Sequence, residues 1–508
     1  MQHLVIILTL YIDIMLKKIR TCLGALMFIG ITLLFVDFTG TFHHWFGWMP
    51  KIQFLPALLA MNFIIIAALI VLTLVFGRVY CSVICPMGIL QDLIARLNRK
   101  RNKYSFSKAI SWLRYTMLAV MIVAFVAGLG SLVALLAPYS SYGRIATHLL
   151  QPLWQMGNNV LASVAENADS YAFYSTDVWM KGWPTIIVAV ATLLIVGFLA
   201  FRNGRTYCNT ICPVGTVLGF LARFSWLKVH FDTDKCRNCS QCSKNCKAAC
   251  IDYISHTVDY SRCVACGNCI SKCKFGALAY THKATTAGAT AQESASKGNV
   301  DKGKRSFLIA SAAIATAAIA QDKKKVDGGL AVIQDKVAPA RKTPITPPGS
   351  LSAGNMAKRC TACQLCVSEC PNQVLRPSGG LITLMQPVMS YERGYCRPEC
   401  NRCSTVCPTG AIKPISLSLK SSTQIGHAVW IKKNCVAVTD GVECGNCERH
   451  CPVGAIEMVP MDEEDDNTPF VPAVNETRCI GCGACENLCP ARPLPAIYVE
   501  GHEVHKEV

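Results

Sequence analysis

The last third of the chain holds sixteen cysteines in four groups of four, and this pattern restricts the fold more than any other feature. The first and fourth groups have intervals of x2, x2 and x3, and the second and third lengthen only the first interval, to x3 and x8. A proline follows the last cysteine of every group. Such a run supplies three thiolates to one [4Fe-4S] cube and a fourth to a neighbouring cube, whereas zinc sites and disulfide frameworks require no such pattern. The sequence therefore predicts four cubes in two linked pairs, with the ligands Cys360, Cys363, Cys366, Cys370, Cys396, Cys400, Cys403, Cys407, Cys435, Cys444, Cys447, Cys451, Cys479, Cys482, Cys485 and Cys489.

A second cysteine-rich stretch, residues 228–282, carries two more groups with the regular spacing. Lys247 and Lys274 stand where the other groups have proline, and Cys250 is an alternative to Cys246 as a ligand. Because the spacing of Cys246 is regular, we predict that it is the ligand. The chain should then bind six cubes in all. The ligands in this stretch are Cys236, Cys239, Cys242, Cys246, Cys263, Cys266, Cys269 and Cys273. In the four-group region two pairings are open, the first group with the fourth or the first with the second.

The composition indicates a membrane part. Hydrophobic residues make up 52% of the 508 residues and charged residues only 16%, which is too apolar for an ordinary soluble protein. The formal net charge of +18 counts cysteine as neutral. Six cubes with thiolate ligands, at about −2 each, would offset about 12 of these charges. With no nucleic-acid motif or phosphate-binding loop in the sequence, the charge does not point to a nucleic-acid partner.

Four apolar stretches are long enough to span a bilayer: 21–38, 57–77, about 109–137 and about 183–201. Basic residues concentrate in the segment 78–108, whereas the loops 39–56 and 138–182 contain few. The positive-inside rule therefore places 78–108 in the cytoplasm and the two loops in the periplasm. We predict a four-helix transmembrane module over residues 1–227, followed by a cytoplasmic two-cluster ferredoxin domain over residues 228–282.

An internal repeat lies at the cytoplasmic ends of the second and fourth stretches. Gly-Arg-x-Tyr-Cys-x3-Cys-Pro-x-Gly occurs at 77–88 and again at 204–215. Each proline can begin a new helix, and cysteines four residues apart on a helix share one face. We predict that the four repeat cysteines, Cys81, Cys85, Cys208 and Cys212, converge in a redox or metal site. A pair of redox-active dithiols and two structural turns are the alternatives.

Residues 283–350 form a predicted linker, and within it the segment 302–320 resembles an export signal. A basic pair, Lys304-Arg305, precedes an apolar run that ends near Ala320. This run predicts a short fifth crossing, which would place the four-cluster domain, 351–508, in the periplasm. A helix that does not cross is the alternative.

With these motifs in place, the chain resembles the electron-transfer proteins of periplasmic nitrate-reductase systems. Residues 15–282 resemble a NapH-type membrane quinol dehydrogenase subunit, and residues 302–490 resemble its NapG-type multi-cluster partner. The resemblance implies a fusion of the two in a bacterial inner membrane, with α+β bacterial-ferredoxin-like domains attached to the membrane helices. It also implies electron flow from the membrane quinone pool to a periplasmic reductase or cytochrome.

We therefore predict an iron–sulfur electron-transfer protein that acts as the quinol-oxidising component of a respiratory chain. His43 and His44 are the sequence's only candidates for groups near a quinol, but an interfacial aromatic belt with solvated histidines is the favoured explanation of their surroundings. The alternative function is a membrane copper reductase or cofactor-assembly redox protein. The first half of the chain resembles membrane copper reductases too, but that likeness leaves 351–508 unexplained. An ion pump is disfavoured because the spans lack a series of carboxylates.

Overall fold

A computed structural model describes residues 2–98, 104–170, 172–282, 336–462 and 468–507. The predicted crossing at 306–320 and most of the predicted linker therefore lie outside the described residues. Residues 1–285 and 337–508 form one compact unit, so residues 337–350 belong with the domains and not with a linker. In this part Ile345, Thr346 and Ser350 are buried.

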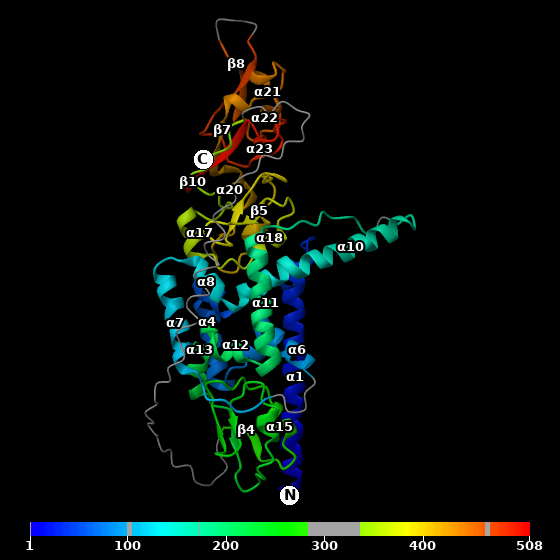
Figure 1. Cartoon of the computed structure of the whole chain (residues 1–508), viewed down its shortest axis with the longest axis vertical. Coiled ribbons are helices and arrows are strands. Elements are labelled where there is room, and N and C mark those ends of the chain that lie inside the picture. Colours follow the sequence, from blue (N-terminus) through cyan, green and yellow to red (C-terminus); the bar gives the residue numbers. More distant parts are fainter. Residues whose placement is uncertain (1, 99–103, 171, 283–335, 463–467, 508) are drawn as a thin grey trace, which may run out of the picture. The chain divides into compact units, whose positions relative to one another are not determined.

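Among the described residues, two helices are long and apolar enough to cross a membrane. Helix α1 (Gln2–Val36) contains the apolar segment Met15–Val36, and α11 (Trp183–Asn203) covers the fourth predicted span. At a rise of 1.5 Å per residue, segments of 22 and 21 residues reach about 30 Å, which matches the hydrocarbon thickness of a bilayer. Figure 1 shows the two helices with roughly parallel axes and opposite chain directions.

The other two predicted spans are interrupted. The stretch 57–77 divides into α3 (Phe54–Leu59) and α4 (Phe63–Phe76), because Met61 has a φ of 55° and Asn62 caps α4 by accepting from the Ile65 amide at 3.3 Å. The stretch 109–137 divides into α7 (Ser111–Val126) and α8 (Gly130–Leu136) at Gly128, whose φ is 74°. Four transmembrane helices are thus not confirmed.

Each repeat forms two short helices joined at its second cysteine. In the first repeat these are α5 (Tyr80–Val83) and α6 (Pro86–Leu97), and in the second they are α12 (Thr206–Thr210) and α13 (Pro213–Leu221). The prolines begin α6 and α13, as predicted. Further elements of the membrane part are α2 (Thr41–Phe46), α9 (Pro138–Ile145), the π-helix η1 (Ala146–Leu150), α10 (Gln151–Glu166) and the 3-10 turn η2 (Ala222–Phe224).

The two-cluster region has the α+β organisation expected of a bacterial ferredoxin. Strand β1 pairs antiparallel with β4, and β2 pairs antiparallel with β3. Two short helices each contain the third cysteine of a group. The bounds are β1 (Lys228–Phe231), α14 (Gln241–Lys244), β2 (Ile251–Asp252), β3 (Thr257–Val258), α15 (Asn268–Lys272) and β4 (Leu278–Thr281).

The four-group region contains two such units in series. The first comprises α17 (Ala353–Arg359), α18 (Leu365–Glu369), the antiparallel pair β5 (Leu375–Pro377) and β6 (Pro387–Met389), α19 (Arg402–Val406) and α20 (Leu417–Ser422). The second comprises β7 (Thr423–Trp430) paired with β10 (Ile497–Glu507), β8 (Ile456–Pro460) paired with β9 (Phe470–Val474), η3 (Lys432–Asn434), α21 (Val436–Thr439), α22 (Asn446–Arg449) and α23 (Ala484–Asn487).

The two ferredoxin-type regions contact α1 at opposite ends of its apolar segment (Figure 1). Near the beginning of this segment, Lys17 donates to the Ser271 hydroxyl of α15 at 2.8 Å. Beyond its end, the turn after Val36 contacts Glu369 of α18. The two-cluster region and the first unit of the four-group region are therefore separated by the length of the apolar segment of α1.

Candidate iron–sulfur centres

The regular cysteine loops share one backbone conformation. The residue just before the second cysteine and the residue just after it both have positive φ, a left-handed conformation that non-glycine residues adopt at a cost. In one loop Ala362 and Gln364 have φ values of 49° and 69°. Successive turns of this kind direct backbone amides into a concave nest that suits an anionic group. The same pair of positions is left-handed in three other loops: Asn238 and Ser240, Ala265 and Gly267, and Gly481 and Gly483.

The fourth cysteine of one group lies beside the first three of its neighbour. Cys273 lines one small cavity together with the three leading cysteines of the first loop of the two-cluster region. Cys370 lines another with Cys396, Cys400 and Cys403. These cavities have the exchanged ligand sets that the spacing predicts.

The remaining contacts support sequential pairing in the four-group region. Burial and, to a smaller extent, the nearby Cys407 thiolate raise the pKa of Cys363 to about 12, so the first group faces the second. Burial also raises the pKa of Cys482 to about 12, with a further contribution from Cys451. Groups three and four share a separate core. Of the two open pairings, the structure favours the first group with the second and the third with the fourth.

The structure also bears on the choice between Cys246 and Cys250. Their sulfur atoms are 3.5 Å apart. The charge of the Cys246 thiolate acts to raise the pKa of all three of Cys263, Cys266 and Cys269, and Cys250 interacts with Cys246 and Cys263. These interactions favour Cys246 as the fourth ligand, which stays a prediction.

Backbone amides donate to several of these sulfur atoms. The fourth cysteines accept from amides a few residues further on: Cys273 from Ala277 at 3.3 Å, Cys451 from Ala455 at 3.2 Å and Cys489 from Ala496 at 3.3 Å. Such hydrogen bonds stabilise cluster thiolates and tune their redox potential. In the described residues no group of three or more His, Cys, Asp or Glu side chains is placed to hold a single metal ion. The loops fit cubes, whose ligands stand further apart.

The four repeat cysteines do converge. Cys81, Cys85, Cys208 and Cys212 are each 4% exposed and lie in one core. Burial and the charge of Cys81 together raise the pKa of Cys208 to about 11. The helix expected through each pair instead ends two residues before the second cysteine, which is the N-cap of the next helix. The turn between the two helices still brings both cysteines of each repeat into the same buried core.

The arginines of the repeat hold the two copies together by a reciprocal exchange. Arg78 donates to the Cys208 carbonyl at 3.2 Å, and Arg205 donates to the Cys81 carbonyl at 2.6 Å. Both arginines are fully buried. Arg78 also lies 3.8 Å from the Cys81 sulfur, and Gln91 donates to the Cys208 sulfur at 3.1 Å. Two cations beside four thiols make this site suitable for an anionic cluster. The sequence analysis missed this role, although both repeats carry the arginine.

The repeat glycines are required by close packing. A Cβ atom on Gly88 would overlap the Cys81 carbonyl oxygen, and one on Gly215 would overlap the Cys208 carbonyl oxygen. Each second helix therefore rests directly on the first cysteine of its own repeat. This explains why Cys-Pro is followed by x-Gly in both copies.

The four-cysteine site has close neighbours in both ferredoxin-type regions. Arg78 donates to the Ser261 carbonyl at 2.9 Å, two residues before Cys263. On the other side the fully buried Arg144 of α9 acts electrostatically on both Tyr207 and Cys363. A Cβ atom on Gly143 would overlap the Cys363 carbonyl oxygen, so α9 packs directly on that cluster loop.

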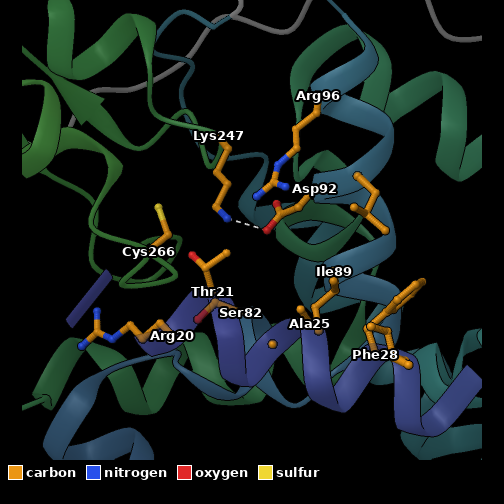
Figure 2. Close-up of a pocket in the computed structure, with 13 residues that line it drawn as sticks. Arg20, Thr21, Ala25, Phe28, Ser82, Ile89, Asp92, Arg96, Lys247 and Cys266 are labelled. Atoms are coloured by element: carbon orange, nitrogen blue, oxygen red, sulfur yellow. Dashed lines mark hydrogen bonds and ion pairs between the residues drawn. The ribbon is translucent and has the colours of Figure 1, made fainter. Parts of the chain in front are cut away.

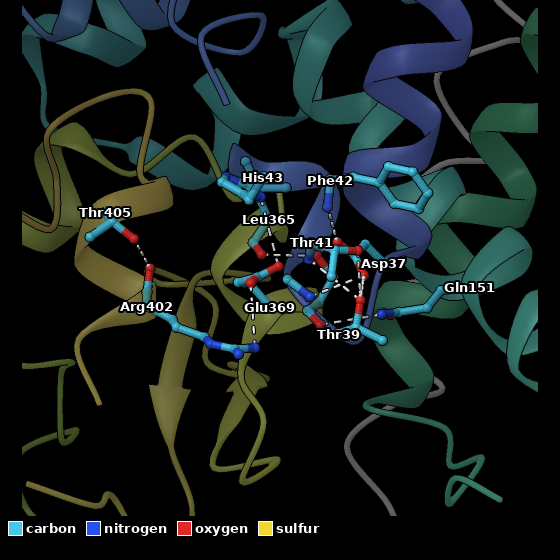
Figure 3. A network of polar contacts seen from close by, with 12 residues as sticks. Asp37, Thr39, Thr41, Phe42, His43, Gln151, Leu365, Glu369, Arg402 and Thr405 are labelled. Carbon is cyan, nitrogen blue, oxygen red and sulfur yellow. Dashed lines mark hydrogen bonds and ion pairs between the residues drawn. The ribbon is translucent and has the colours of Figure 1, made fainter. Parts of the chain in front are cut away.

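The first loop does not assemble the predicted group of histidines and aromatic residues. His44 stacks edge-on against Trp45 at 5.8 Å, and Trp45 is 72% exposed. His43 instead points toward Glu369, with a distance of 3.7 Å between Nδ1 and a carboxylate oxygen (Figure 3). Burial lowers the pKa of His43 to about 4. His43 therefore belongs to a contact between the membrane part and α18, and His44 to the surface.

Further polar contacts surround His43 in this interface (Figure 3). Asp37 closes the turn after α1, because its carboxylate accepts from the amides of Thr39 at 2.8 Å, Gly40 at 3.0 Å and Phe42 at 2.9 Å. Gln151 of α10 donates to the Ser368 carbonyl at 3.2 Å. The first unit of the four-group region is thus bound to the loops 39–56 and 138–182.

Three family models match parts of the chain. A model described as a 4Fe-4S binding domain matches residues 58–104 and 183–233, which include the two repeats. A 4Fe-4S dicluster domain matches 442–492, and a second 4Fe-4S binding domain matches 256–279. The presence of [4Fe-4S] ferredoxin domains is confirmed.

The chain is similar to several ferredoxin-type proteins. It is 31% identical over 167 residues to the methylamine utilization ferredoxin-type protein MauM of Methylobacillus flagellatus, covering 32% of this chain and 70% of that protein. It is 28% identical to the ferredoxin-type protein NapH of Haemophilus influenzae, with coverages of 36% and 53%. It is 25% identical to the putative electron transport protein YccM of Escherichia coli, with coverages of 38% and 47%.

The chain spans about half the length of the first curated relatives it matches. No solved structure matches it. The likeness to NapH agrees with the resemblance drawn from the sequence, whereas the fusion with a NapG-type partner stays a prediction.

Proposed function

The chain belongs to the family of ferredoxin-type electron-transport proteins that includes NapH, MauN and MauM, and on that premise we propose that it oxidises membrane quinol. Its role in electron transfer through [4Fe-4S] clusters follows from the family and its domains. The quinol donor and a periplasmic reductase or cytochrome as acceptor are the proposed part. Six cubes on the 24 grouped cysteines would carry the electrons.

One observation carries this proposal: the four-cysteine site lies between the two ferredoxin-type regions. Arg78 hydrogen-bonds to the loop of Cys263. On the other side α9 packs on the loop of Cys363 at Gly143, and its Arg144 interacts electrostatically with Tyr207, next to Cys208, and with Cys363. A cluster or redox-active thiol group at this position would complete a route from one end of α1 to the other. Without it, the two sets of cubes would be separated by the apolar length of α1, about 30 Å.

The proposed topology is a multi-pass protein of the bacterial inner membrane. Residues 228–282 contact the beginning of the apolar segment of α1, next to the basic segment 78–108 that the positive-inside rule assigns to the cytoplasm. The first unit of the four-group region contacts the loops 39–56 and 138–182, which the same rule assigns to the periplasm. These contacts support a cytoplasmic two-cluster domain and a periplasmic four-cluster domain.

The function is tested by adding a menaquinol analogue anaerobically to the purified chain in lipid nanodiscs. We expect the visible absorption of the clusters to bleach, and bleaching to reverse when a periplasmic fraction supplies the acceptor. A chain that stays oxidised with menaquinol but is re-oxidised by copper after chemical reduction would contradict quinol oxidation and favour a metal reductase.

The topology is tested separately on spheroplasts. Protease added outside should cut the chain within 321–350 and spare 283–301. If both segments are protected, the four-cluster domain is cytoplasmic and the proposed periplasmic acceptor is wrong.

A further inference from the structure

A cavity of about 350 Å³ lies between α1, α6 and the second loop of the two-cluster region (Figure 2). Its lining comes from three segments that are far apart in the sequence. Ala25 and Phe28 belong to α1, Asp92 belongs to α6, and Lys247 and Cys266 belong to the ferredoxin-type domain. Its volume is within the range of small-molecule sites.

The lining divides into an apolar and a polar part. Ala25 and Phe28 of α1 lie near Ile89 of α6 at one end (Figure 2). At the other end Lys247 and Arg205 both bind the Asp92 carboxylate, Arg205 at 2.6 Å, and Figure 2 shows the Arg96 guanidinium beside them. A ligand with an apolar body and a polar, oxygen-bearing end has the matching chemistry.

The apolar end is accessible from the side of α1. Leu26 and Ile29 lie in the apolar segment of α1 and are 55% and 56% exposed. Exposed apolar side chains on a spanning helix face lipid. A hydrophobic ligand dissolved in the bilayer can therefore reach the cavity along α1.

The polar end is next to a cluster ligand. Cys266 lines the cavity. Arg20 donates to the carbonyl of the preceding residue, Ala265, so this loop is fixed to α1. The Lys247 charge also acts on the Cys266 thiolate. The loops fit a cube at this position, so a ligand in the cavity would lie beside a one-electron acceptor.

We infer that this cavity binds the head group of an isoprenoid quinol, with the isoprenoid chain along α1. The inference rests on the proposed function and adds the place of the reaction. It moves the quinol site from the His43 loop to the opposite end of α1, where the two-cluster domain is attached.

The side chains that line the cavity can bind the quinol head group and stabilise its negative charge. Arg96 and Lys247 favour the anionic oxygen that forms when a quinol hydroxyl loses its proton, and Thr21 and Ser82 supply hydroxyls at the same cavity. Oxidation of one quinol to quinone releases two electrons and two protons. Cubes held by the cysteines of residues 228–282 would each accept one of these electrons, and the protons would pass to water at the polar end.

The test compares two neighbouring positions on α1. Ala25→Trp fills the cavity, whereas Leu26→Trp adds the same side chain to the lipid-facing surface. Binding of a hydroxyquinoline N-oxide, a quinol analogue, is measured by fluorescence quenching on the full chain in nanodiscs. We expect Ala25→Trp to weaken binding at least tenfold and Leu26→Trp to leave it unchanged. Equal iron content and equal bleaching by dithionite show that a variant is folded and loaded.

A second variant guards against misfolding of the first. Arg96→Gln removes one charge at the polar end and leaves α1 unchanged, and it should also weaken binding of the analogue severalfold. Unchanged binding in both Ala25→Trp and Arg96→Gln would overturn the assignment of the cavity.

The location and the function fail in different ways. Bleaching by a menaquinol analogue that is normal in Ala25→Trp would overturn the location and leave quinol oxidation standing. The opposite result is also informative. If the analogue binds the unmodified chain but not Ala25→Trp, and menaquinol never reduces the unmodified chain, the cavity is supported and the proposed function is overturned.

Discussion

Replacement of Asp92 by asparagine should destabilise the junction between the repeats and the two-cluster domain. The Asp92 carboxylate accepts from Arg205 Nε at 2.8 Å and also binds Lys247. Burial opposes its ionisation, but the two cations lower its pKa to about 2, from 3.8 in the unfolded chain. That difference corresponds to about 2 kcal/mol at neutral pH. Because the variant also leaves the fully buried Arg205 uncompensated, the loss can reach about 3–5 kcal/mol.

The sign of the pH dependence follows from the same values. A carboxyl whose folded pKa is lowered contributes its full stabilisation above the unfolded pKa and loses it as the pH falls toward the folded one. Both values for Asp92 lie below 4. The difference in stability between the unmodified chain and Asp92→Asn should therefore be constant from about pH 5 to 8.

Thermal unfolding in detergent, followed by the loss of cluster absorption, measures this effect. At about 2–4 °C per kcal/mol, we expect a melting temperature lower by at least about 5 °C. Asp232→Asn is the matched control, because Asp232 pairs with Lys235 at 2.7 Å on the exposed surface of the same domain. Surface pairs contribute about 1 kcal/mol or less. Equal melting temperatures for the two variants would refute the importance of the buried pair.

Three other predictions concern the cysteines and the repeat. Replacing the four repeat cysteines by serine should leave the roughly 24 irons of the six cubes in place, measured anaerobically, but stop quinol-driven reduction of the cubes in residues 351–508; full reduction of those cubes in the variant would mean that electrons do not pass through the site. Cys246→Ser should remove about four irons and Cys250→Ser none, and the reverse result would exchange their roles. Gly88→Ala should lower the melting temperature because the added Cβ overlaps the Cys81 carbonyl oxygen. Gly157→Ala in α10, which has open space around it, is the control and should be neutral or slightly stabilising. Equal melting temperatures for the two variants would contradict the close packing at Gly88.

The cluster loops could be predicted from the sequence because ligation is local. Three of the four ligands in a regular group lie within seven residues, so spacing alone identifies them. The starts of α6 and α13 were predictable for a similar reason, because proline fits the first turn of a helix.

The extent of the helices was harder to predict. A hydropathy window averages over Met61 and Gly128, and neither residue is polar enough to interrupt the apolar stretch. The backbone changes direction there because both residues have positive φ. Hydropathy therefore predicted two longer helices than the chain forms.

The contacts between distant segments were beyond a single sequence. Arg78 and Asn209 are 131 positions apart and Arg205 and Asp92 are 113 apart. No spacing rule connects them. The repeated Arg-x-Tyr-Cys was the available signal, since a buried site explains an arginine kept beside each cysteine pair better than a surface turn does.

Arg144 provides the strongest physical argument that the four-cysteine site and the Cys363 loop carry negative charge together. Its guanidinium is fully buried, and its hydrogen bonds go to the Ala134 carbonyl and the Ser141 hydroxyl, both at 3.0 Å. Among the described residues it forms no ion pair with a carboxylate. Burial lowers the pKa of Arg144 to about 10, while Tyr207 and Cys363 raise it, so it stays charged at neutral pH. An uncompensated buried cation costs several kcal/mol, and thiolate-bound cubes at about −2 each would supply the missing counter-charge on either side.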